Sequence, residues 1–281
     1  MKIQKLIDKK LIFACLDEVI RPEDSVIIFY VGIWPFIHQL NLKDKNVCRG
    51  FLRILENYIG NKRTMLFPSF TSKEFFSLNK FDVDLSLPKE SGIIPTIALK
   101  SKKYYRTPQP LHSYLVKGPK TKEVKKLSLV TSWGRGSILQ WLSKNNARIC
   151  PIGIPWRIGC SYFHKFEEKY KVPWRYFKIF KGNMYKNKKF IKEIVEKKYS
   201  GPKNILFKYD YKPIEKMLIN NNLTLSSSSK DLPMQSSLTS QIDTVCNEFF
   251  QKNPWELVKN SAKIKQWVKN DKNKEKRIKH Y

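Results

Sequence analysis

His112 and His164 are the two candidates for acid–base chemistry among the four histidines, and His164 has the more informative surroundings. Glu167 lies three residues after it and Glu168 four residues after it. In a helical turn, one of these carboxylates shares the face of the imidazole and can orient it or raise its basicity. An imidazole held in one tautomer by a carboxylate is what a general base requires. The same spacing also fits a half-buried histidine that caps a local hydrogen-bond network, and spacing alone does not choose between them.

Two other chemistries at this histidine have weaker support. Cys160 precedes His164 by four residues, and Cys150 lies ten residues before Cys160, which raises the question of a zinc site. Zinc sites usually draw on paired cysteine or histidine ligands, and neither a second pair nor an H-E-x-x-H motif is present. Nothing marks Cys160 as a reactive thiolate. We therefore expect no metal site and no cysteine nucleophile.

Nucleotide-dependent phosphoryl transfer and hydride transfer are disfavoured as well. A Walker loop is absent, and Gly134-Arg135-Gly136 lacks the third glycine and the preceding strand of a dinucleotide-binding fingerprint.

The charge of the chain suggests an anionic partner. The 281 residues carry 54 Lys and Arg against 24 Asp and Glu, a net charge of +30. Only 10 of these cations are Arg, the residue that base readout and bidentate phosphate recognition favour, so nucleic acid is not the expected partner. The 41% hydrophobic and 13% aromatic content predicts a folded protein rather than a disordered one.

The cysteines and apolar stretches bear on location. Five cysteines form an odd set without repeated spacing, and the start of the chain lacks the pattern of a signal peptide. The longest apolar stretch, 26–37, is too short to span a bilayer and contains Pro35. We expect a cytoplasmic protein without a transmembrane segment. The oligomeric state is left open, with a homodimer as one option.

The apolar pattern in the first half predicts strands alternating with helices. Continuous apolar runs at 25–31, 64–67 and 148–154 are typical of strands buried on both faces of a sheet. Helical spacing of apolar residues predicts helices over 3–16 and 47–59. A helix between two buried strands indicates an α/β domain.

The second half is less regular. Residues 81–91 and 104–113 are rich in proline and polar residues, and we expect loops there that carry chemistry. Further expectations are a short strand at 204–209, helices at 213–218 and 243–250, and a surface loop at 224–229. The basic residues 259–281 are expected to form a tail or frayed helix after a domain over 1–258.

Five segments follow one another in an order that is similar to one family's motifs. Residues 64–71 resemble the family motif GTLVMPTFT, 81–95 resemble FDP…PS…GxIPE, and 106–113 resemble RSxHPxxS. Residues 118–139 resemble GP…FGxxSPL, and 152–167 resemble LGV…TxxHxxE. From about residue 6 to residue 258 the chain thereby resembles the aminoglycoside 3-N-acetyltransferase family. The resemblance implies a three-layer α/β/α single domain with a mixed central sheet. It also implies direct transfer of an acyl group from acetyl-CoA, or another acyl-CoA, to an amine.

The resemblance also implies roles for particular residues. His164 matches the family's catalytic histidine, with Glu167 orienting it. Donor-binding residues are expected to be Arg106, Ser113, Ser137 and Tyr30, and substrate-binding residues Asp82, Gln109 and Ser161. Two of these have structural alternatives, because Arg106 could instead staple a loop and Asp82 could form an Asx turn.

The chain departs from the family pattern on the acceptor side. Phe29 begins the segment that matches HSSL, Gln109 replaces the histidine of RSxHP, Thr96 replaces the glutamate of GxIPE, and Leu99 replaces an arginine. A polycationic antibiotic calls for a pocket rich in carboxylates, and this basic chain has lost one. We therefore expect an anionic acceptor, such as a nucleotide- or lipid-linked amino sugar of a bacterial surface polysaccharide. Retained base chemistry with an altered acceptor is the conservative interpretation of these departures, and loss of activity is the further-reaching alternative.

Two alternatives stay open. One is acetylation of aminoglycoside antibiotics. The other is a non-enzymatic protein that binds nucleic acid or a membrane surface, because residues 165–203 hold thirteen Lys or Arg against four acids around the aromatic segment 174–177.

Overall fold

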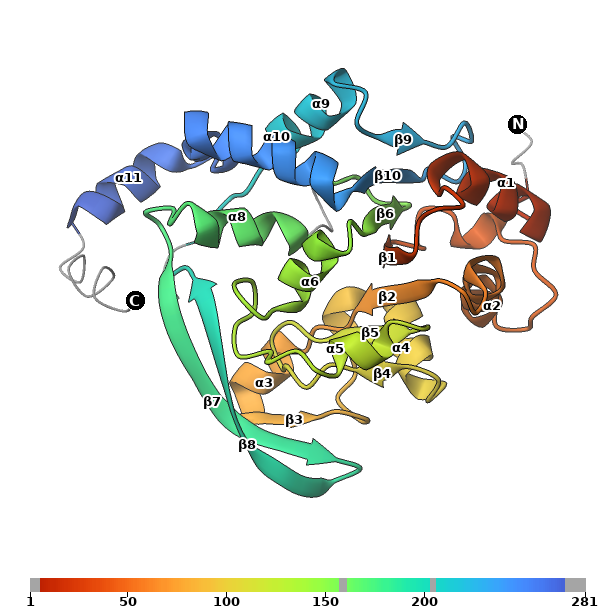
Figure 1. Ribbon diagram of the computed structural model, residues 1–281, viewed down its shortest axis with the longest axis horizontal. Coiled ribbons are helices and arrows are strands. Elements are labelled where there is room, and N and C mark those ends of the chain that lie inside the picture. The colour runs from red at the N-terminus through yellow and green to blue at the C-terminus, as the bar shows by residue number, and fades with distance from the viewer. Residues whose placement is uncertain (1–5, 157–160, 203–205, 271–281) are drawn as a thin grey trace.

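Two sheets organise the chain, which a computed structural model describes over residues 6–156, 161–202 and 206–270 (Figure 1). The larger sheet has seven strands in the order β4-β5-β2-β1-β6-β10-β9. Strands β2, β1 and β6 run parallel at its centre, and the outer strands pair antiparallel, so the sheet is mixed as expected. Its strands are β1 Val26–Val31, β2 Thr64–Pro68, β4 Tyr105–Arg106, β5 Tyr114–Lys117, β6 Arg148–Ile152, β9 Leu225–Ser226 and β10 Gln235–Leu238.

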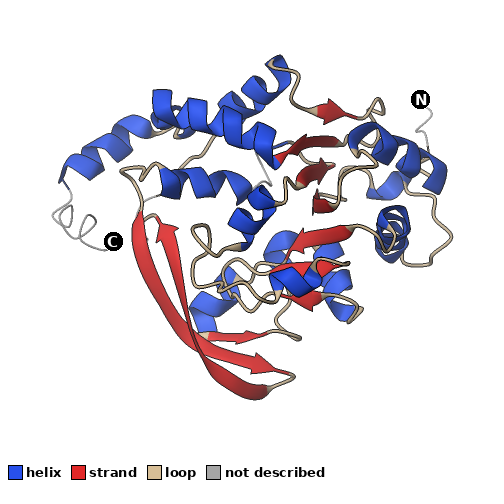
Figure 2. Ribbon diagram, in the orientation of Figure 1, coloured by secondary structure: helices blue, strands red, loops and turns tan. Residues whose placement is uncertain are grey.

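Helices cover both faces of this sheet, which confirms the three-layer α/β/α prediction (Figure 2). On β1, Ile27 and Phe29 pack with α1, α2 and α4, whereas Ile28 and Tyr30 pack with α6, α8, α9 and α10. Because both faces are buried, the strand is apolar at every position. The helices are α1 Lys9–Val19, α2 Val47–Ile59, α3 Ser72–Leu78, α4 Ile93–Lys100, α5 Thr121–Val124, α6 Ile138–Lys144, α8 His164–Lys169, α9 Lys212–Asn220, α10 Thr239–Lys252 and α11 Ser261–Asn270, with 3-10 turns Ile37–Gln39, Lys89–Ser91, Ser161–Phe163 and Pro254–Leu257.

The lysine-rich stretch after α8 forms a second sheet that the apolar pattern does not predict. Its strands are β3 Lys80–Asp82, β7 Tyr176–Lys186 and β8 Lys189–Ser200, in the order β3-β7-β8. Asn187 and Lys188 connect β7 to β8 with φ of 48° and 66°, a left-handed pair typical of a tight hairpin turn. Lysines interrupt the alternation of apolar and polar residues, and the turn lacks the usual glycine, so neither hairpin signal is visible in the sequence.

Helix α2 and the three central strands agree closely with the sequence predictions. The Asn46 side chain caps α2 by accepting a hydrogen bond from the Arg49 amide, and Gly60 ends the helix with φ of 68°. A left-handed residue at this position is natural for glycine, which has no Cβ to clash. The predicted helices at 213–218 and 243–250 lie within α9 and α10.

Other predicted boundaries were wrong. The first helix begins at Lys9 and does not include residues 6–8, because Asp8 caps it, and it continues to Val19. Residues 3–5 of the predicted helix lie outside the described residues. The strand expected at 204–209 does not form among its described residues, where Tyr209 makes a single bridge to Val258. The segments expected to be loops contain short pieces of strand, namely β3, β4 and β9. Among the described residues, no helix is long and apolar enough to cross a membrane.

A buried ion pair joins the end of α1 to the central sheet and provides the first testable prediction. Asp24 pairs with Arg148 of β6, and both side chains are almost fully buried. Asp24 also accepts the Arg21 amide at 2.7 Å, and Arg148 reaches the Ser236 hydroxyl at 3.2 Å. Replacing Asp24 with alanine leaves a buried guanidinium without its counter-ion, so we expect a loss of about 3–5 kcal/mol in the free energy of unfolding.

Denaturant unfolding measures this loss. Glu248→Ala serves as the control, because it breaks only the exposed pair with Lys252 on α10 and should cost less than about 1 kcal/mol. Equal effects of the two substitutions would contradict the structural role of Asp24.

Candidate active site

A cavity of about 440 Å³ opens at the carboxyl ends of the parallel strands. Tyr30 and Val31 at the end of β1, Pro68 at the end of β2 and Ile154 just after β6 contribute to its wall. In this sheet β2 and β6 flank β1 on opposite sides, so the cavity lies where the strand order changes direction. Such a position is the usual ligand site of an open α/β sheet.

His164 lies on the wall of this cavity at the start of α8. Its Nδ1 is 2.5 Å from Oε2 of Glu167, and the Tyr211 hydroxyl is 3.2 Å from the same nitrogen. The imidazole stacks on Trp133, with ring centroids 4.8 Å apart and planes 21° apart. Among the described residues Nε2 has no hydrogen-bond partner, and the side chain is 24% exposed. The predicted contact of His164 with Glu167 is therefore present, and it leaves one ring nitrogen available.

A buried arginine extends this contact into a chain of three titratable groups. Arg175 lies 3.1 Å from the same Glu167 oxygen that contacts His164, and the Glu167 side chain is fully buried. The guanidinium also donates to the Tyr209 hydroxyl at 3.1 Å and to the Tyr199 carbonyl at 3.2 Å. Its several donors hold it in one orientation, so it fixes the position of the carboxylate.

The pKa shifts in this chain favour a neutral imidazole. Burial lowers the pKa of His164 below its usual 6.5, although Glu167 acts to raise it. Burial would raise the pKa of Glu167, but the charge of Arg175 and the contacts with His164 and Tyr209 together lower it. Glu167 is thus ionised at neutral pH and accepts a hydrogen bond from the protonated Nδ1. The lone pair of the neutral imidazole is then on Nε2.

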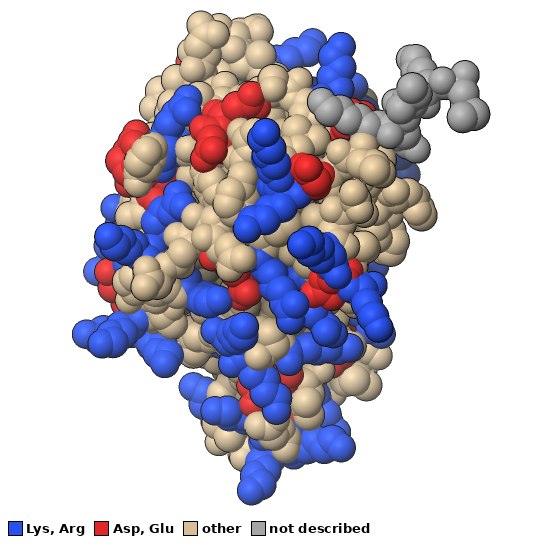
Figure 3. Space-filling model, turned by 90° about the vertical axis from the view of Figure 1, so that its right-hand side faces the viewer, with Lys and Arg blue, Asp and Glu red and all other residues tan. Residues whose placement is uncertain are grey.

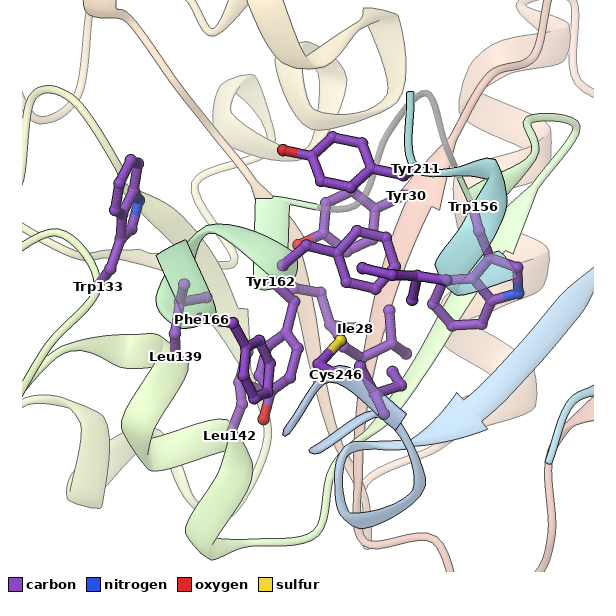
Figure 4. Close-up of a cluster of buried hydrophobic side chains, with 14 of the residues drawn as sticks. Ile28, Tyr30, Trp133, Leu139, Leu142, Trp156, Tyr162, Phe166, Tyr211 and Cys246 are labelled. Carbon is purple, nitrogen blue, oxygen red and sulfur yellow. The ribbon is translucent and has the colours of Figure 1, made fainter. Parts of the chain in front are cut away.

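Three hydroxyl groups meet next to the histidine. The Ser161 hydroxyl lies 3.0 Å from that of Tyr30 and 3.3 Å from that of Tyr114. Tyr30, Ser161 and Tyr211 line the cavity, and Figure 4 shows the rings of Tyr30 and Tyr211 on the same side of the buried cluster. The structure thus brings two residues expected from the sequence, Tyr30 and Ser161, to the cavity of His164.

Arg106 and Ser113 lie behind the cavity rather than on its wall. The Arg106 guanidinium donates to the backbone carbonyls of Ser86 at 2.5 Å and Ser69 at 2.7 Å, and stacks on the Phe81 ring. Burial lowers its pKa to about 9. The Ser113 hydroxyl donates to the Ser69 carbonyl at 2.5 Å. Both residues therefore hold the loops around β2 and β5 together through hydrogen bonds.

The remaining candidates also have internal partners. Ser137 caps α6 by accepting the Gln140 amide at 3.2 Å. The Gln109 amide donates to the carbonyls of Leu129 and Thr131 at 2.8 and 2.9 Å. Asp82 forms an Asx turn and accepts backbone amides at the tip of the β7–β8 hairpin. None of the three is among the described residues that line the cavity.

Sequence reasoning missed Arg175, Trp133 and Tyr211 as parts of the site. Arg175 belongs to segment 174–177, which the sequence suggested as a surface platform for nucleic acid or membrane. The structure corrects this location, because Trp174 is fully buried and Arg175 faces Glu167. His112 is also buried, and its Nε2 accepts the Trp133 indole at 3.1 Å, so it supports Trp133 rather than the cavity.

Metal ligands do not gather in the described part of the chain. No group of three His, Cys, Asp or Glu side chains there could hold an ion. Cys160, part of the zinc pattern considered above, lies outside the described residues.

A histidine held by a carboxylate at the carboxyl ends of parallel strands is an arrangement that can accept a proton during group transfer. A sequence profile described as aminoglycoside 3-N-acetyltransferase matches residues 44–221. The chain belongs to that family and is an N-acetyltransferase. No curated protein sequence matches it.

Solved structures share the fold at low sequence identity. AAC-IIIb, described as binary with CoASH, has a TM-score of 0.73 and 14% identity over 88% of this chain and 97% of its own. Sisomicin-bound AAC-VIa has a TM-score of 0.70 and 12% identity over 87% of this chain and 97% of its own. YokD from Bacillus subtilis has a TM-score of 0.68 and 11% identity over 87% of this chain and 99% of its own.

Proposed function

We propose that the protein transfers the acetyl group of acetyl-CoA to the amine of an amino sugar, with His164 as general base. The observation that carries this proposal is the chain from His164 through Glu167 to Arg175, with His164 on the cavity wall. Together the two partners keep Nδ1 protonated and Nε2 free. A cytoplasmic location agrees with the described cysteines Cys15, Cys48 and Cys150, which are free and buried.

The reaction is a direct transfer. The amine nitrogen attacks the thioester carbonyl carbon, a C–N bond forms, and the C–S bond breaks as CoA leaves as its thiolate. Nε2 of His164 takes the proton from the attacking nitrogen, and the imidazolium that results is stabilised by ionised Glu167. The hydroxyls of Tyr30 and Ser161 belong to residues on the wall of the same cavity and would stabilise the oxygen that becomes negative in the transition state.

The cavity fits the pantetheine arm of acetyl-CoA. Its wall combines apolar side chains such as Val31, Ile33 and Phe70 with the hydroxyls of Tyr30 and Ser161, which suits a thin chain of alternating methylene and amide groups. No Lys or Arg is among its described lining residues, so the cavity matches the arm and thioester rather than the phosphates. The CoA-bound state of AAC-IIIb supports the same donor.

The acceptor side favours an anionic or weakly charged amine. Glu90 is the one carboxylate among the described residues that line the cavity, and its Oε1 already accepts the Lys73 amide at 2.8 Å. Thr96 donates its hydroxyl to the Gly92 carbonyl and contributes no charge. Several ammonium groups would therefore lack counter-ions when desolvated. A nucleotide- or lipid-linked amino sugar does not bring several ammonium groups into the cavity, and its negative charge is attracted by the net charge of +30.

Acetylation of an aminoglycoside is the alternative, supported by the family and by the sisomicin complex of AAC-VIa. CoA release, followed with a thiol reagent, discriminates the two when a UDP-linked amino sugar and gentamicin are offered at equal concentration. We expect the higher kcat/KM with the anionic acceptor, decreasing as salt screens the attraction. Preference for gentamicin would overturn the anionic assignment but not the acetyl transfer.

Acetyl-CoA itself should stabilise the fold. At a concentration 100 times its Kd, binding adds about 2.7 kcal/mol, which corresponds to a Tm increase of roughly 5–10 °C for a chain of this size. Differential scanning fluorimetry measures the shift, and ADP without the pantetheine arm is the matched control. An equal shift with ADP would contradict binding through the arm.

A further inference from the structure

The β7–β8 hairpin extends away from the seven-stranded sheet and ends in a fixed tip (Figure 1). The carboxylate of Asp82 accepts the amides of Asn187 and Lys188, at 3.2 and 2.7 Å. On one face of the hairpin, Met184 and Ile194 are buried in a small core with Phe75, Phe81 and Leu111. The hairpin is therefore an anchored element that presents its other face and its tip outward.

Apolar side chains remain exposed on this hairpin. Residues directly opposite in an antiparallel pair share a face, and here the register pairs Ile179 with Lys197 and Val195 with Lys181. Ile179 and Val195, on the face opposite Met184, are 65% and 52% exposed, and Phe190 and Ile191 near the tip are 57% and 49% exposed. Apolar residues concentrated on one projecting element are more than the scattered exposure that any surface shows.

Lysines surround these apolar residues. Between residues 176 and 200 the chain has eight Lys, no Arg and two Glu, and one of the acids, Glu196, is buried. Figure 3 shows Lys and Arg gathered over the lower end of the molecule, where the hairpin lies in Figure 1. The exposed lysines of the distal hairpin are Lys181, Lys186, Lys188, Lys189 and Lys192.

We propose that this hairpin surface, formed by Ile179, Phe190, Ile191, Val195 and the five exposed lysines, docks the protein onto an anionic lipid membrane. Lysines attract acidic headgroups, and apolar side chains between them enter the boundary between headgroups and acyl chains. RNA fits less well, because its recognition relies on Arg and on stacked aromatic rings, and this surface offers no Arg and one exposed Phe. The docking does not depend on the acetyl-transfer activity proposed above.

Vesicle co-sedimentation of the full chain tests the proposal. The probes are vesicles of phosphatidylcholine alone and vesicles with 30% phosphatidylglycerol, with a single-stranded RNA oligonucleotide in a separate binding assay. We expect binding to the anionic vesicles, and a decrease in affinity of at least roughly tenfold for Lys189→Glu/Lys192→Glu. Lys43→Glu/Lys45→Glu, away from the hairpin, is the matched charge control and should retain most of the binding.

A second variant separates apolar insertion from charge attraction. Phe190→Ser/Ile191→Ser leaves the charge unchanged and should weaken vesicle binding several-fold, whereas Leu6→Ser, another exposed apolar position, should not. All variants should keep the wild-type Tm and the acetyl-CoA shift. Absent vesicle binding, binding of RNA alone, or an unchanged affinity of Phe190→Ser/Ile191→Ser would each overturn the proposal.

Discussion

Replacing His164 with alanine is expected to lower kcat for acetyl transfer by roughly 10²- to 10⁴-fold, the usual contribution of a positioned general base. The reason lies in the geometry, since Glu167 and Tyr211 contact Nδ1 and leave Nε2 to accept the proton of the amine. KM for acetyl-CoA should change little, because His164 is one of fifteen described residues that line the cavity.

Steady-state release of CoA measures this loss. His38→Ala is the matched control, an exposed histidine in the 3-10 turn after β1, and should keep wild-type kcat. Added imidazole should restore part of the activity of His164→Ala, because the substitution leaves space for it beside Glu167. A kcat within a few-fold of wild type in His164→Ala, with the fold intact, would rule out the base.

The pH profile gives an independent check on the same residue. Because burial lowers the pKa of His164 below 6.5, the neutral base persists at pH 7, and activity should be lost only as the pH falls through this lowered value. Glu167→Gln removes the charge that raises the pKa of His164, so the acidic limb should move to still lower pH while the plateau decreases. An acidic limb that moves upward would contradict the assigned role of Glu167.

Replacing Arg175 with methionine should have the second large effect, because it changes both stability and the pH profile. The substitution leaves the fully buried Glu167 carboxylate without its main counter-ion, so we expect a loss of about 3–5 kcal/mol in the free energy of unfolding. Arg175 also lowers the pKa values of His164 and Glu167. Without it both should increase, and the acidic limb of the activity profile should move to higher pH.

The double variant Glu167→Gln/Arg175→Met separates these effects. It removes both buried charges and should be more stable than Arg175→Met alone, because no uncompensated ion remains. Denaturant unfolding and the pH dependence of kcat/KM are the two measurements. If the double variant loses as much stability as the sum of the single ones, Arg175 acts through packing on Trp133 and Tyr209 rather than through Glu167.

The central sheet could be predicted because burial on both faces leaves a local signal. Strands β1, β2 and β6 are apolar at nearly every position, and α2 has its cap, its periodicity and its final glycine within one short segment. The β7–β8 hairpin leaves no comparable signal. One of its faces is exposed and its lysines are solvated. Its inner face is buried only by Phe75, Phe81 and Leu111, which lie far away in the chain.

The contacts of the candidate site likewise differ in whether they join residues close together or far apart in the sequence. His164 and Glu167 are three residues apart, so one helical turn is enough to bring them together, and the sequence alone determined that contact as it did the three central strands and α2. Arg175 reaches Glu167 because the turn between α8 and β7 folds back, with the Val172 amide on the Glu167 carbonyl. Ser161 meets Tyr30 from 131 residues away. Arg106 is a different case. The family resemblance suggested that it binds the donor or fixes a loop, and its guanidinium donates to the backbone carbonyls of Ser86 and Ser69. Tertiary structure decided these pairings, because hydrogen bonds between distant segments depend on where the packed sheet places them and not on spacing along the chain.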